Sequence, residues 1–222
     1  MLHISNMVRE RYAGIKFGIM IMDRINVKDT NTDFERAKTK LENLTRDDFA
    51  GFDKKKMRTI APFSDYHAYY KMFKKTYHVL HQCESIASGK RNLPNGPPLV
   101  QAMFMAEIKN QLLTAGYDYT TLEPLFNVKL ASGESSFDGM GMKKCTPPQN
   151  DIIFSDKHVL LGSIICGPDH EHRIQPTTTG VLFAIYGVPG VTEGQMESHF
   201  EDIRNFVRLF SPEATMQEMI IK

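Results

Sequence analysis

The chain has 222 residues, of which 41% are hydrophobic and 24% charged, and this composition excludes a disordered or fibrous protein. The length suits one large domain that can bury a substantial core. The formal net charge of +1 gives no general attraction to polyanions, so binding to a nucleic acid would depend on a local basic patch.

The first predicted elements are a buried strand and a surface helix. Residues 16–22 form an apolar run that indicates the strand. Thr32 and Glu35 have the spacing of a capping box, so we expect a helix to begin there. Its apolar positions recur at steps of three and four residues: Phe34, Ala37, Leu41 and Leu44. Charged residues fill the other face, so this helix is expected to lie on the surface of a core.

Two further helices are predicted in the middle of the chain. Residues 66–80 indicate an amphipathic helix with apolar positions at Tyr66, Tyr70, Phe73, Tyr77 and Leu80. Glycines and prolines in residues 88–98 predict a loop. Residues 99–113 predict a mostly buried helix, because they are mainly apolar with few β-branched side chains. Its polar residues share one side, which faces either solvent or a cavity: Glu107, Asn110 and Gln111.

Beyond Gly116 the pattern changes to short strands, predicted at residues 126–130, 151–154, 158–166 and 181–186. The last two are near-continuous apolar runs and are expected at the centre of a sheet. The polar residues 155–157 predict a hairpin connection, and Gly133-Glu134 predicts a structural turn.

The final helix is predicted from a second capping-box pair, Thr192 and Gln195. Its apolar positions are Met196, Phe200, Ile203, Val207 and Phe210. Ser211-Pro212 ends it, and the segment up to Lys222 is expected to be a short helix or a frayed tail. Without an internal repeat or linker, residues 1–222 are expected to form a single α+β domain.

The apolar runs and the cysteines bear on the compartment. The longest apolar stretches are far shorter than the ~20 residues of a membrane span, and the first residues lack the apolar run of a secretory signal. Cys83, Cys145 and Cys166 have no CxxC spacing and are expected to be buried thiols in a reducing compartment. We therefore expect a cytoplasmic protein that does not contact a membrane.

The segment LVQAMFMAEIKNQLLTAGYD, from Leu99 to Asp118, resembles without a gap the helix and turn of the B3/4 domain of the phenylalanyl-tRNA synthetase beta chain. Later landmarks follow in the family's order: Thr121-Leu122, Gly133-Glu134, the hairpin over residues 151–166, Thr177 to Thr179, and Val181-Leu-Phe. The resemblance covers residues 66–191. As in free-standing members of the family, it implies an extension of strand and helices at residues 1–65 and a helix with a tail at residues 192–222.

This resemblance implies a B3/4-like fold, a central mixed or antiparallel sheet flanked by helices, with an amino-acid-sized pocket. In the synthetase, the domain hydrolyses the ester of a mischarged tRNA. The pocket positions that the resemblance implies are Met103, Phe104, Glu107, Ala115, Tyr117 and Ala184.

Several of these positions depart from the family pattern. Met103-Phe104 replaces Thr-Asn, Ala115 replaces a histidine, and Ala184 replaces the glutamate that selects tyrosine. These changes remove polar partners, so an apolar or differently shaped ligand is expected instead of tyrosine.

The cluster Cys166, His170 and His172 has the form C-x3-H-x-H. Thiolate and imidazole are zinc ligands, but a fourth ligand is missing, so a solvated or ligand-gating loop is the preferred interpretation and neither a metal nor a cofactor is expected. The same residues are the catalytic candidates, as a nucleophile with its base or as groups that contact substrate at the pocket mouth. The sequence identifies no orienting acid for them.

Basic residues on the predicted helix of residues 66–80 offer an RNA surface. Lys71, Lys74 and Lys75, with Lys54, Lys55, Lys56 and Arg58, could contact phosphates beside tyrosines that stack on bases. The preferred interpretation is an ordinary solvated helix face, and an RNA surface is favoured mainly by the family resemblance.

The leading hypothesis is a B3/4-like protein that binds an amino acid or the aminoacyl 3′ end of a tRNA and acts as a deacylase in trans. The alternatives are a non-catalytic module for tRNA or a small metabolite, and an enzyme acting on a free amino-acid derivative. The oligomeric state is not predicted.

Overall fold

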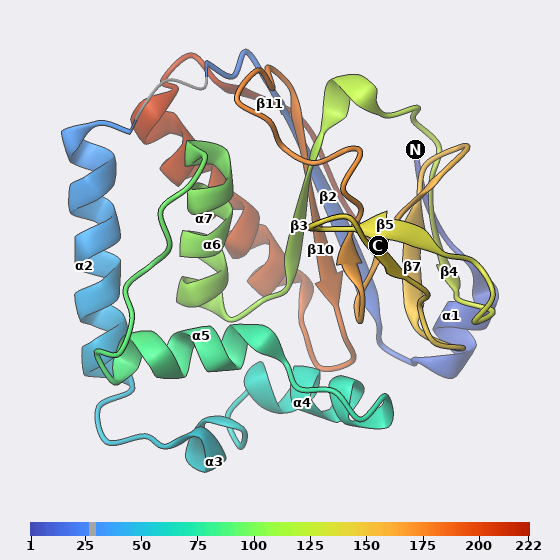
Figure 1. Ribbon diagram of the computed structural model, residues 1–222, viewed down its shortest axis with the longest axis horizontal. Coiled ribbons are helices and arrows are strands. Elements are labelled where there is room, and N and C mark those ends of the chain that lie inside the picture. Colours follow the sequence, from blue (N-terminus) through green and yellow to red (C-terminus); the bar gives the residue numbers. More distant parts are fainter. Residues whose placement is uncertain (27–29) are drawn as a thin grey trace.

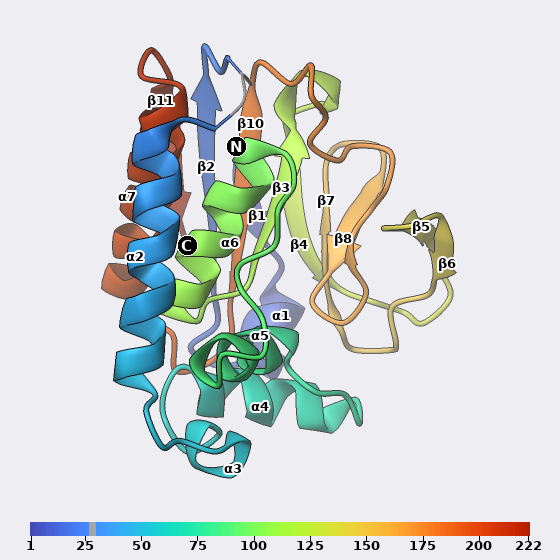
Figure 2. The same ribbon diagram turned by 60° about the vertical axis from the view of Figure 1, so that its left-hand side comes forward.

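Two main β-sheets lie beside one another in the computed structural model, which describes residues 1–26 and 30–222 (Figure 1). Figure 2 shows α2, α6 and α7 on one side of the four-stranded sheet, the five-stranded sheet on its other side, and the β5–β6 hairpin beyond. Helices α3, α4 and α5 lie at the lower end in both views. The predicted α+β class, with mixed and antiparallel sheets flanked by helices, is confirmed.

The four-stranded sheet has the order β11-β2-β10-β3, and each neighbouring pair is antiparallel. Its strands are β2 (Lys16–Asp23), β3 (Thr114–Asp118), β10 (Val181–Gly187) and β11 (Thr215–Ile221). Every residue of β10 is buried, as expected for a continuous apolar run at the centre of a sheet.

The five-stranded sheet has the order β1-β4-β7-β8-β9. Its strands are β1 (Leu2–Ile4), β4 (Phe126–Leu130), β7 (Ile152–Ser155), β8 (Leu160–Ser163) and β9 (Gly167–Pro168). The sheet is mixed, because β1 runs parallel to β4 while the other pairs are antiparallel. The apolar run of residues 158–166 is shorter as a strand than predicted, because the chain turns after Ser163 to form β9. A hairpin of β5 (Phe137–Gly139) and β6 (Lys143–Cys145) lies next to this turn.

The helices cover the outer face of the four-stranded sheet and one end of the molecule. They are α1 (Asn6–Arg11), α2 (Thr32–Asp48), α3 (Lys54–Met57), α4 (Phe63–Met72), α5 (His78–Ala87), α6 (Pro98–Asn110) and α7 (Glu193–Phe210), with a 3₁₀ turn η1 at Tyr119–Thr121. Gly18 of β2 lets α7 approach the sheet, since a Cβ there would lie 2.9 Å from Met196 and Phe200. Within the described residues, none of the helices has both the length and the apolar character that crossing a bilayer requires.

Aromatic rings fill the space between the two sheets. Phe154 of β7 lies 4.9 Å from Phe17, 5.5 Å from Phe126, 5.9 Å from Tyr117 and 6.5 Å from Tyr186, measured between ring centroids. The contact with Phe126 is stacked and the others are tilted or edge-on, and centroid separations in this range are typical of aromatic pairs. Phe154 therefore links strands of both sheets in one core.

The predicted helix of residues 66–80 is in fact two helices, so this prediction was wrong. The chain leaves α4 after Met72, Lys74 takes a left-handed backbone conformation with φ of 54°, and α5 begins after Tyr77. In one straight helix, the Cα atoms of Tyr66 and Tyr77 would be about 16 Å apart along the axis. Their rings instead stack at 4.4 Å, and this packing requires the turn.

The two predicted capping boxes have different outcomes. Thr192 and Gln195 form theirs in full at the start of α7. Helix α2 begins at Thr32 as predicted, but its cap is Asn31, whose side chain accepts a hydrogen bond from the Phe34 backbone. Leu44, expected on the buried face of α2, is 46% exposed. Gly133 has a φ of +88°, which fits the predicted turn.

The segment after Ser211 was predicted to be a short helix or a frayed tail, and this prediction was wrong. Residues 215–221 form β11, which pairs with β2 from Thr215 opposite Asp23 to Ile221 opposite Gly18. Without β11, one edge of the apolar strand β2 would have unpaired backbone groups.

Candidate functional site

A cavity of about 480 Å³, called the Glu107 cavity below, lies between α6, the edge strand β3 and the turn that joins β8 to β9. Helix α6 contributes Met103, Phe104 and Glu107, and β3 contributes Ala115 and Gly116. Gly116 keeps this wall open, since a Cβ there would lie 2.6 Å from the side chain of Ile174.

The structure brings only part of the expected pocket together. Met103, Phe104, Glu107 and Ala115 line the Glu107 cavity. Tyr117 and Ala184 are absent from its walls, which corrects their expected placement. The Tyr117 ring packs on Phe154 between the sheets, and Ala184 pairs with Ala115, so β3 separates it from the cavity.

Glu107 supplies a buried carboxyl to the cavity and is 1% exposed. Its Oε1 accepts a hydrogen bond of 2.8 Å from the Thr114 backbone N–H. Its Oε2 is buried and has no hydrogen-bond partner within the described residues. Burial raises the pKa of this carboxyl to about 8, although the Thr114 hydrogen bond acts in the opposite direction. The group is therefore largely protonated at neutral pH, and one of its oxygens is left without a partner in the described residues.

The remaining walls are mainly apolar, with cations and some neutral polar side chains among them. Val100, Leu113 and Ile174 add apolar surface, while Lys75 and Arg173 carry positive charge. A cavity of this composition suits a small molecule with an apolar body and both donor and acceptor groups.

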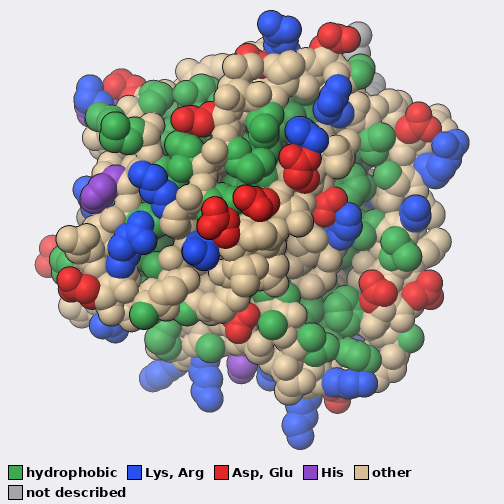
Figure 3. Space-filling model, turned by 180° about the vertical axis from the view of Figure 1, so that it is seen from behind, with side chains coloured by type: hydrophobic (Ala, Val, Ile, Leu, Met, Phe, Trp, Pro, Cys, Tyr) green, Lys and Arg blue, Asp and Glu red, His purple; other side chains and the backbone are tan. Residues whose placement is uncertain are grey.

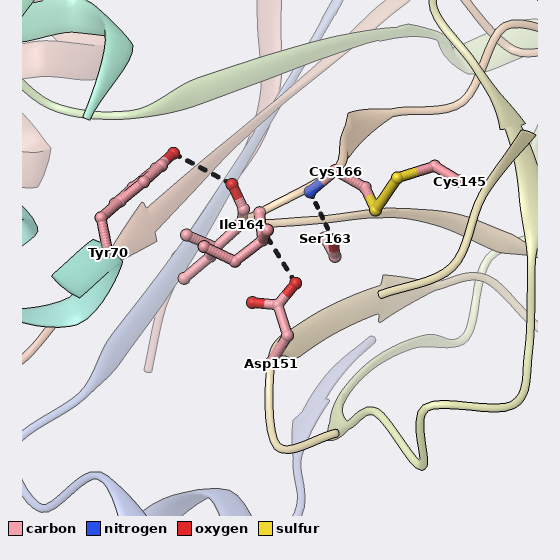
Figure 4. Close-up of a disulfide and its surroundings, with 7 residues drawn as sticks. Tyr70, Cys145, Asp151, Ser163, Ile164 and Cys166 are labelled. Atoms are coloured by element: carbon pink, nitrogen blue, oxygen red, sulfur yellow. Dashed lines mark hydrogen bonds between the residues drawn. A yellow bond between two sulfur atoms is a disulfide. The ribbon is translucent and has the colours of Figure 1, made fainter. Parts of the chain in front are cut away.

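Buried tyrosines hold the frame of the cavity. Tyr66 Oη donates to the Tyr186 carbonyl at 2.7 Å and accepts from the Leu113 backbone N–H at 3.1 Å. Tyr70 Oη donates to the Ile164 carbonyl at 3.0 Å, as Figure 4 shows. These bonds tie α4 to β10 and to the turn that joins β8 to β9.

Cys166 lies in the cavity wall and forms a disulfide with Cys145 (Figure 4). The prediction of three free thiols is therefore wrong for this pair, whereas Cys83 is a buried thiol as expected. The fold explains the pairing, since a bridge between Gly139 and Asp169 holds the β5–β6 hairpin against the turn that carries Cys166. The inference of a reducing compartment depended on free thiols and loses that basis.

The disulfide removes Cys166 as a nucleophile or zinc ligand. Within residues 1–26 and 30–222, no group of three or more His, Cys, Asp or Glu side chains is arranged to hold a metal ion. The C-x3-H-x-H spacing therefore does not produce a metal centre in this part of the chain.

The two histidines of that motif line a second cavity of about 650 Å³, called the His172 cleft, beside the β5–β6 hairpin. His172 Nδ1 lies 2.6 Å from Asp169 Oδ2. His170 Nδ1 is buried without a hydrogen-bond partner in the described residues. Arg173 borders both the His172 cleft and the Glu107 cavity. Asp169, the acid in contact with His172, was not among the predicted site residues, although its spacing of three residues from His172 was a usable signal.

The predicted basic residues lie at the lower end of the molecule in Figure 1, on α3, on α4 and in the turn after α4. Lys71, Lys74 and Lys75 are exposed, and Lys75 also lines the Glu107 cavity. Figure 3 shows lysine and arginine side chains projecting at this lower edge. Lys54 and Lys56 have local partners, because Lys54 Nζ lies 2.7 Å from His81 Nε2 and Lys56 lies over the Phe52 ring.

The fold is similar to a solved structure of a tRNA synthetase fragment. No protein-family model and no curated protein matches the sequence. The structure is an N-terminal fragment of the phenylalanyl-tRNA synthetase beta-subunit from Pyrococcus horikoshii, with a TM-score of 0.54 and 8% identity. The match covers 100% of this chain and 54% of that one, so the chain spans about half its length. At this identity the likeness shows the fold alone, and it agrees with the fold that the Leu99–Asp118 segment implies.

Proposed function

We propose that the protein binds an amino acid, or the aminoacyl end of a tRNA, in the Glu107 cavity. The observation that carries this proposal is a fully buried carboxyl that lines a cavity of small-molecule size and has one oxygen without a hydrogen-bond partner in the described residues. The likeness to a synthetase beta-subunit fragment supports an aminoacyl ligand over other small molecules.

The chemistry of the walls assigns a place to each part of such a ligand. Met103 and Phe104 provide an apolar surface for the side chain. Glu107 pairs with an amine or a hydroxyl, as acceptor when ionised and as donor when protonated. Lys75 and Arg173 attract the carboxylate of a free amino acid or the phosphates next to an aminoacyl group.

The test is ligand-dependent thermal stabilisation. A panel of amino acids, amino-acid amides and aminoacyl-nucleoside analogues is added to the wild type, where a ligand at 100 times its Kd should stabilise the fold by about 2.7 kcal/mol. Glu107→Gln should weaken binding about 10-fold or more, since one buried hydrogen bond to the ligand is lost or mismatched. Glu134→Gln, at an exposed turn, is the matched control. A panel without any stabilising member, or a Glu107→Gln variant with wild-type affinity, would contradict the proposal.

A tRNA partner is favoured by the exposed lysines at the cavity. Because Lys75 lines the cavity and Lys71 and Lys74 are exposed beside it, phosphates of a bound tRNA could contact them while its 3′ end enters. Replacing the three by glutamate should abolish salt-dependent tRNA binding, and replacing Lys71 and Lys74 alone, which do not line the cavity, should weaken tRNA binding and leave amino-acid binding intact. The same charge change at the exposed residues Lys40, Lys90 and Lys129 is the control. Equal loss of tRNA binding in both triple variants would argue against a specific surface.

A further inference from the structure

The His172 cleft contains a buried histidine–aspartate pair that ligand binding in the Glu107 cavity does not use. Asp169 and His172 are 5% and 8% exposed. Asp169 Oδ2 lies 2.6 Å from His172 Nδ1 and also accepts from the His172 backbone N–H at 3.2 Å. The Asp169 backbone N–H donates to the Leu161 carbonyl of β8 at 2.8 Å, so the sheet fixes the pair in place.

This geometry leaves one ring nitrogen available. With Nδ1–H donated to Asp169, the lone pair of the neutral ring is on Nε2. Within the described part of the chain, the ring makes its hydrogen bond through Nδ1 and none through Nε2, and the residue lines the cleft. The His172 ring therefore presents a fixed proton acceptor to the contents of the cleft.

Three carboxyl groups surround the His172 ring. Asp169 is in contact with it, and Glu171 and Asp156 are close enough to interact electrostatically with the pair. Asp169 Oδ1 is buried without a hydrogen-bond partner among the described residues, and burial raises the pKa of Asp169 while the His172 hydrogen bond opposes that effect. Proton uptake at Nε2 would place a positive charge beside this carboxyl.

The cleft is adjacent to the Glu107 cavity. Arg173 follows His172 directly, lines both hollows, and donates through NH1 to the His170 carbonyl at 2.7 Å. A ligand anchored at Glu107 with an ester group at Arg173 would therefore have its reacting carbon at the border of the two hollows.

We propose that His172 is the general base of an ester-hydrolysing site and that Asp169 is its positioning residue; this inference rests on the proposed binding of an aminoacyl ligand. Nε2 removes a proton from water while the water oxygen bonds to the ester carbonyl carbon. The Arg173 guanidinium stabilises the resulting oxyanion. The bond from carbon to the leaving oxygen then breaks, and that oxygen takes the proton from Nε2, which yields an acid and an alcohol. No cysteine nucleophile is needed, in agreement with the Cys145–Cys166 disulfide.

The test uses a panel of amino-acid p-nitrophenyl esters as substrates and the corresponding amino-acid amides as non-reacting ligands. His172→Gln should lower kcat about 100-fold or more, with KM and thermal stabilisation by the amide unchanged. Asp169→Asn should also lower kcat and alter the pH profile, because the ring loses its fixed tautomer. His158→Gln is the matched control, since His158 pairs with Glu123 at 3.0 Å on the exposed surface outside both hollows.

The outcomes separate this inference from the proposed function. A wild type that is stabilised by an amide but hydrolyses none of the esters overturns the role of His172 and leaves the binding proposal standing. A His172→Gln variant with kcat within threefold of the wild type also overturns it. A wild type that no amide stabilises contradicts the proposed function itself.

Discussion

Replacing Glu107 by glutamine should remove the pH dependence that this residue imposes on stability. Glutamine preserves the shape of the side chain and can still accept from the Thr114 backbone N–H, but it cannot ionise. The Glu107 carboxyl has a folded-state pKa of about 8, above the ordinary value of 4.5, because it is fully buried. The folded protein therefore holds this proton more tightly than the unfolded chain.

The sign and size of the effect follow from linkage. The contribution of Glu107 to stability is complete below pH 4.5, declines as pH rises, and is lost above a pH of about 8. Between pH 5 and pH 8 the loss amounts to about 3 kcal/mol in the wild type, and the glutamine variant does not undergo it. The variant should thus gain about 3 kcal/mol relative to the wild type over this interval.

Urea denaturation of both proteins at pH 5, 6.5 and 8 measures this difference directly. Taking the difference cancels the titration of all other groups that the two proteins share. Glu134→Gln, which alters an exposed carboxylate, should follow the wild type at each pH. A difference that stays constant within about 1 kcal/mol would refute a buried, protonated Glu107.

Other changes test other parts of the structure. Gly116→Val should weaken amino-acid binding at least about 10-fold by calorimetry, because the valine side chain enters the space of Ile174. Gly96→Ala is the control and should not weaken binding, since a Cβ at Gly96 has no atom within 4 Å. Equal affinities of the two variants would show that Gly116 does not shape the cavity wall. Cys145→Ser should lower the unfolding free energy measured in urea by about 3 kcal/mol, because the disulfide links residues separated by 21 positions. The stability of the variant should no longer change when a reducing agent is added. A wild type whose stability is also unchanged by reducing agent would contradict the disulfide. Burial lowers the pKa of His199 to about 3, so the contribution of the neutral ring to stability is present above pH 6.5 and is lost as pH falls below that value. Relative to His199→Gln, the wild type should lose about 3 kcal/mol of unfolding free energy between pH 6.5 and pH 4. Parallel plots of unfolding free energy against pH for the two proteins would rule out this role of His199.

The sequence predicts those elements that local signals specify. The apolar run that begins at Val181 contains no polar residue and becomes the central strand β10. Thr192 and Gln195 lie within one helical turn, so their reciprocal hydrogen bonds form wherever α7 packs. Such signals depend on neighbours a few residues apart, and tertiary packing only reinforces them.

Elements that depend on distant partners were missed or misjudged. The break near Lys74 serves the stacking of Tyr66 on Tyr77, which no helical period reveals. Strand β11 carries the polar pair Gln217 and Glu218 at a register shift, and its identity as a strand comes from β2 at the other end of the chain.

The candidate site divides in the same way. The α6 residues of the pocket, such as Glu107, follow from one continuous helix that resembles a known family, and the structure places them in one wall. Ala184 is on β10, one strand further from the cavity than Ala115 of β3. The order of these strands in the sheet is not encoded by neighbouring residues in the sequence. The contact of His172 with Asp169 depends on side-chain rotamers, and the pairing of Cys166 depends on where a hairpin packs.

The order of strands in the four-stranded sheet also affects how the chain folds while it is being synthesised on the ribosome. Strand β2 ends at Asp23, yet its two neighbours, β10 and β11, begin only at Val181 and Thr215. At about 5–20 residues per second, the apolar β2 segment waits on the order of ten seconds for its first hydrogen-bonding partner. During that interval the nascent chain presents an unpaired hydrophobic strand, which makes it a natural client for chaperones that bind extended apolar segments.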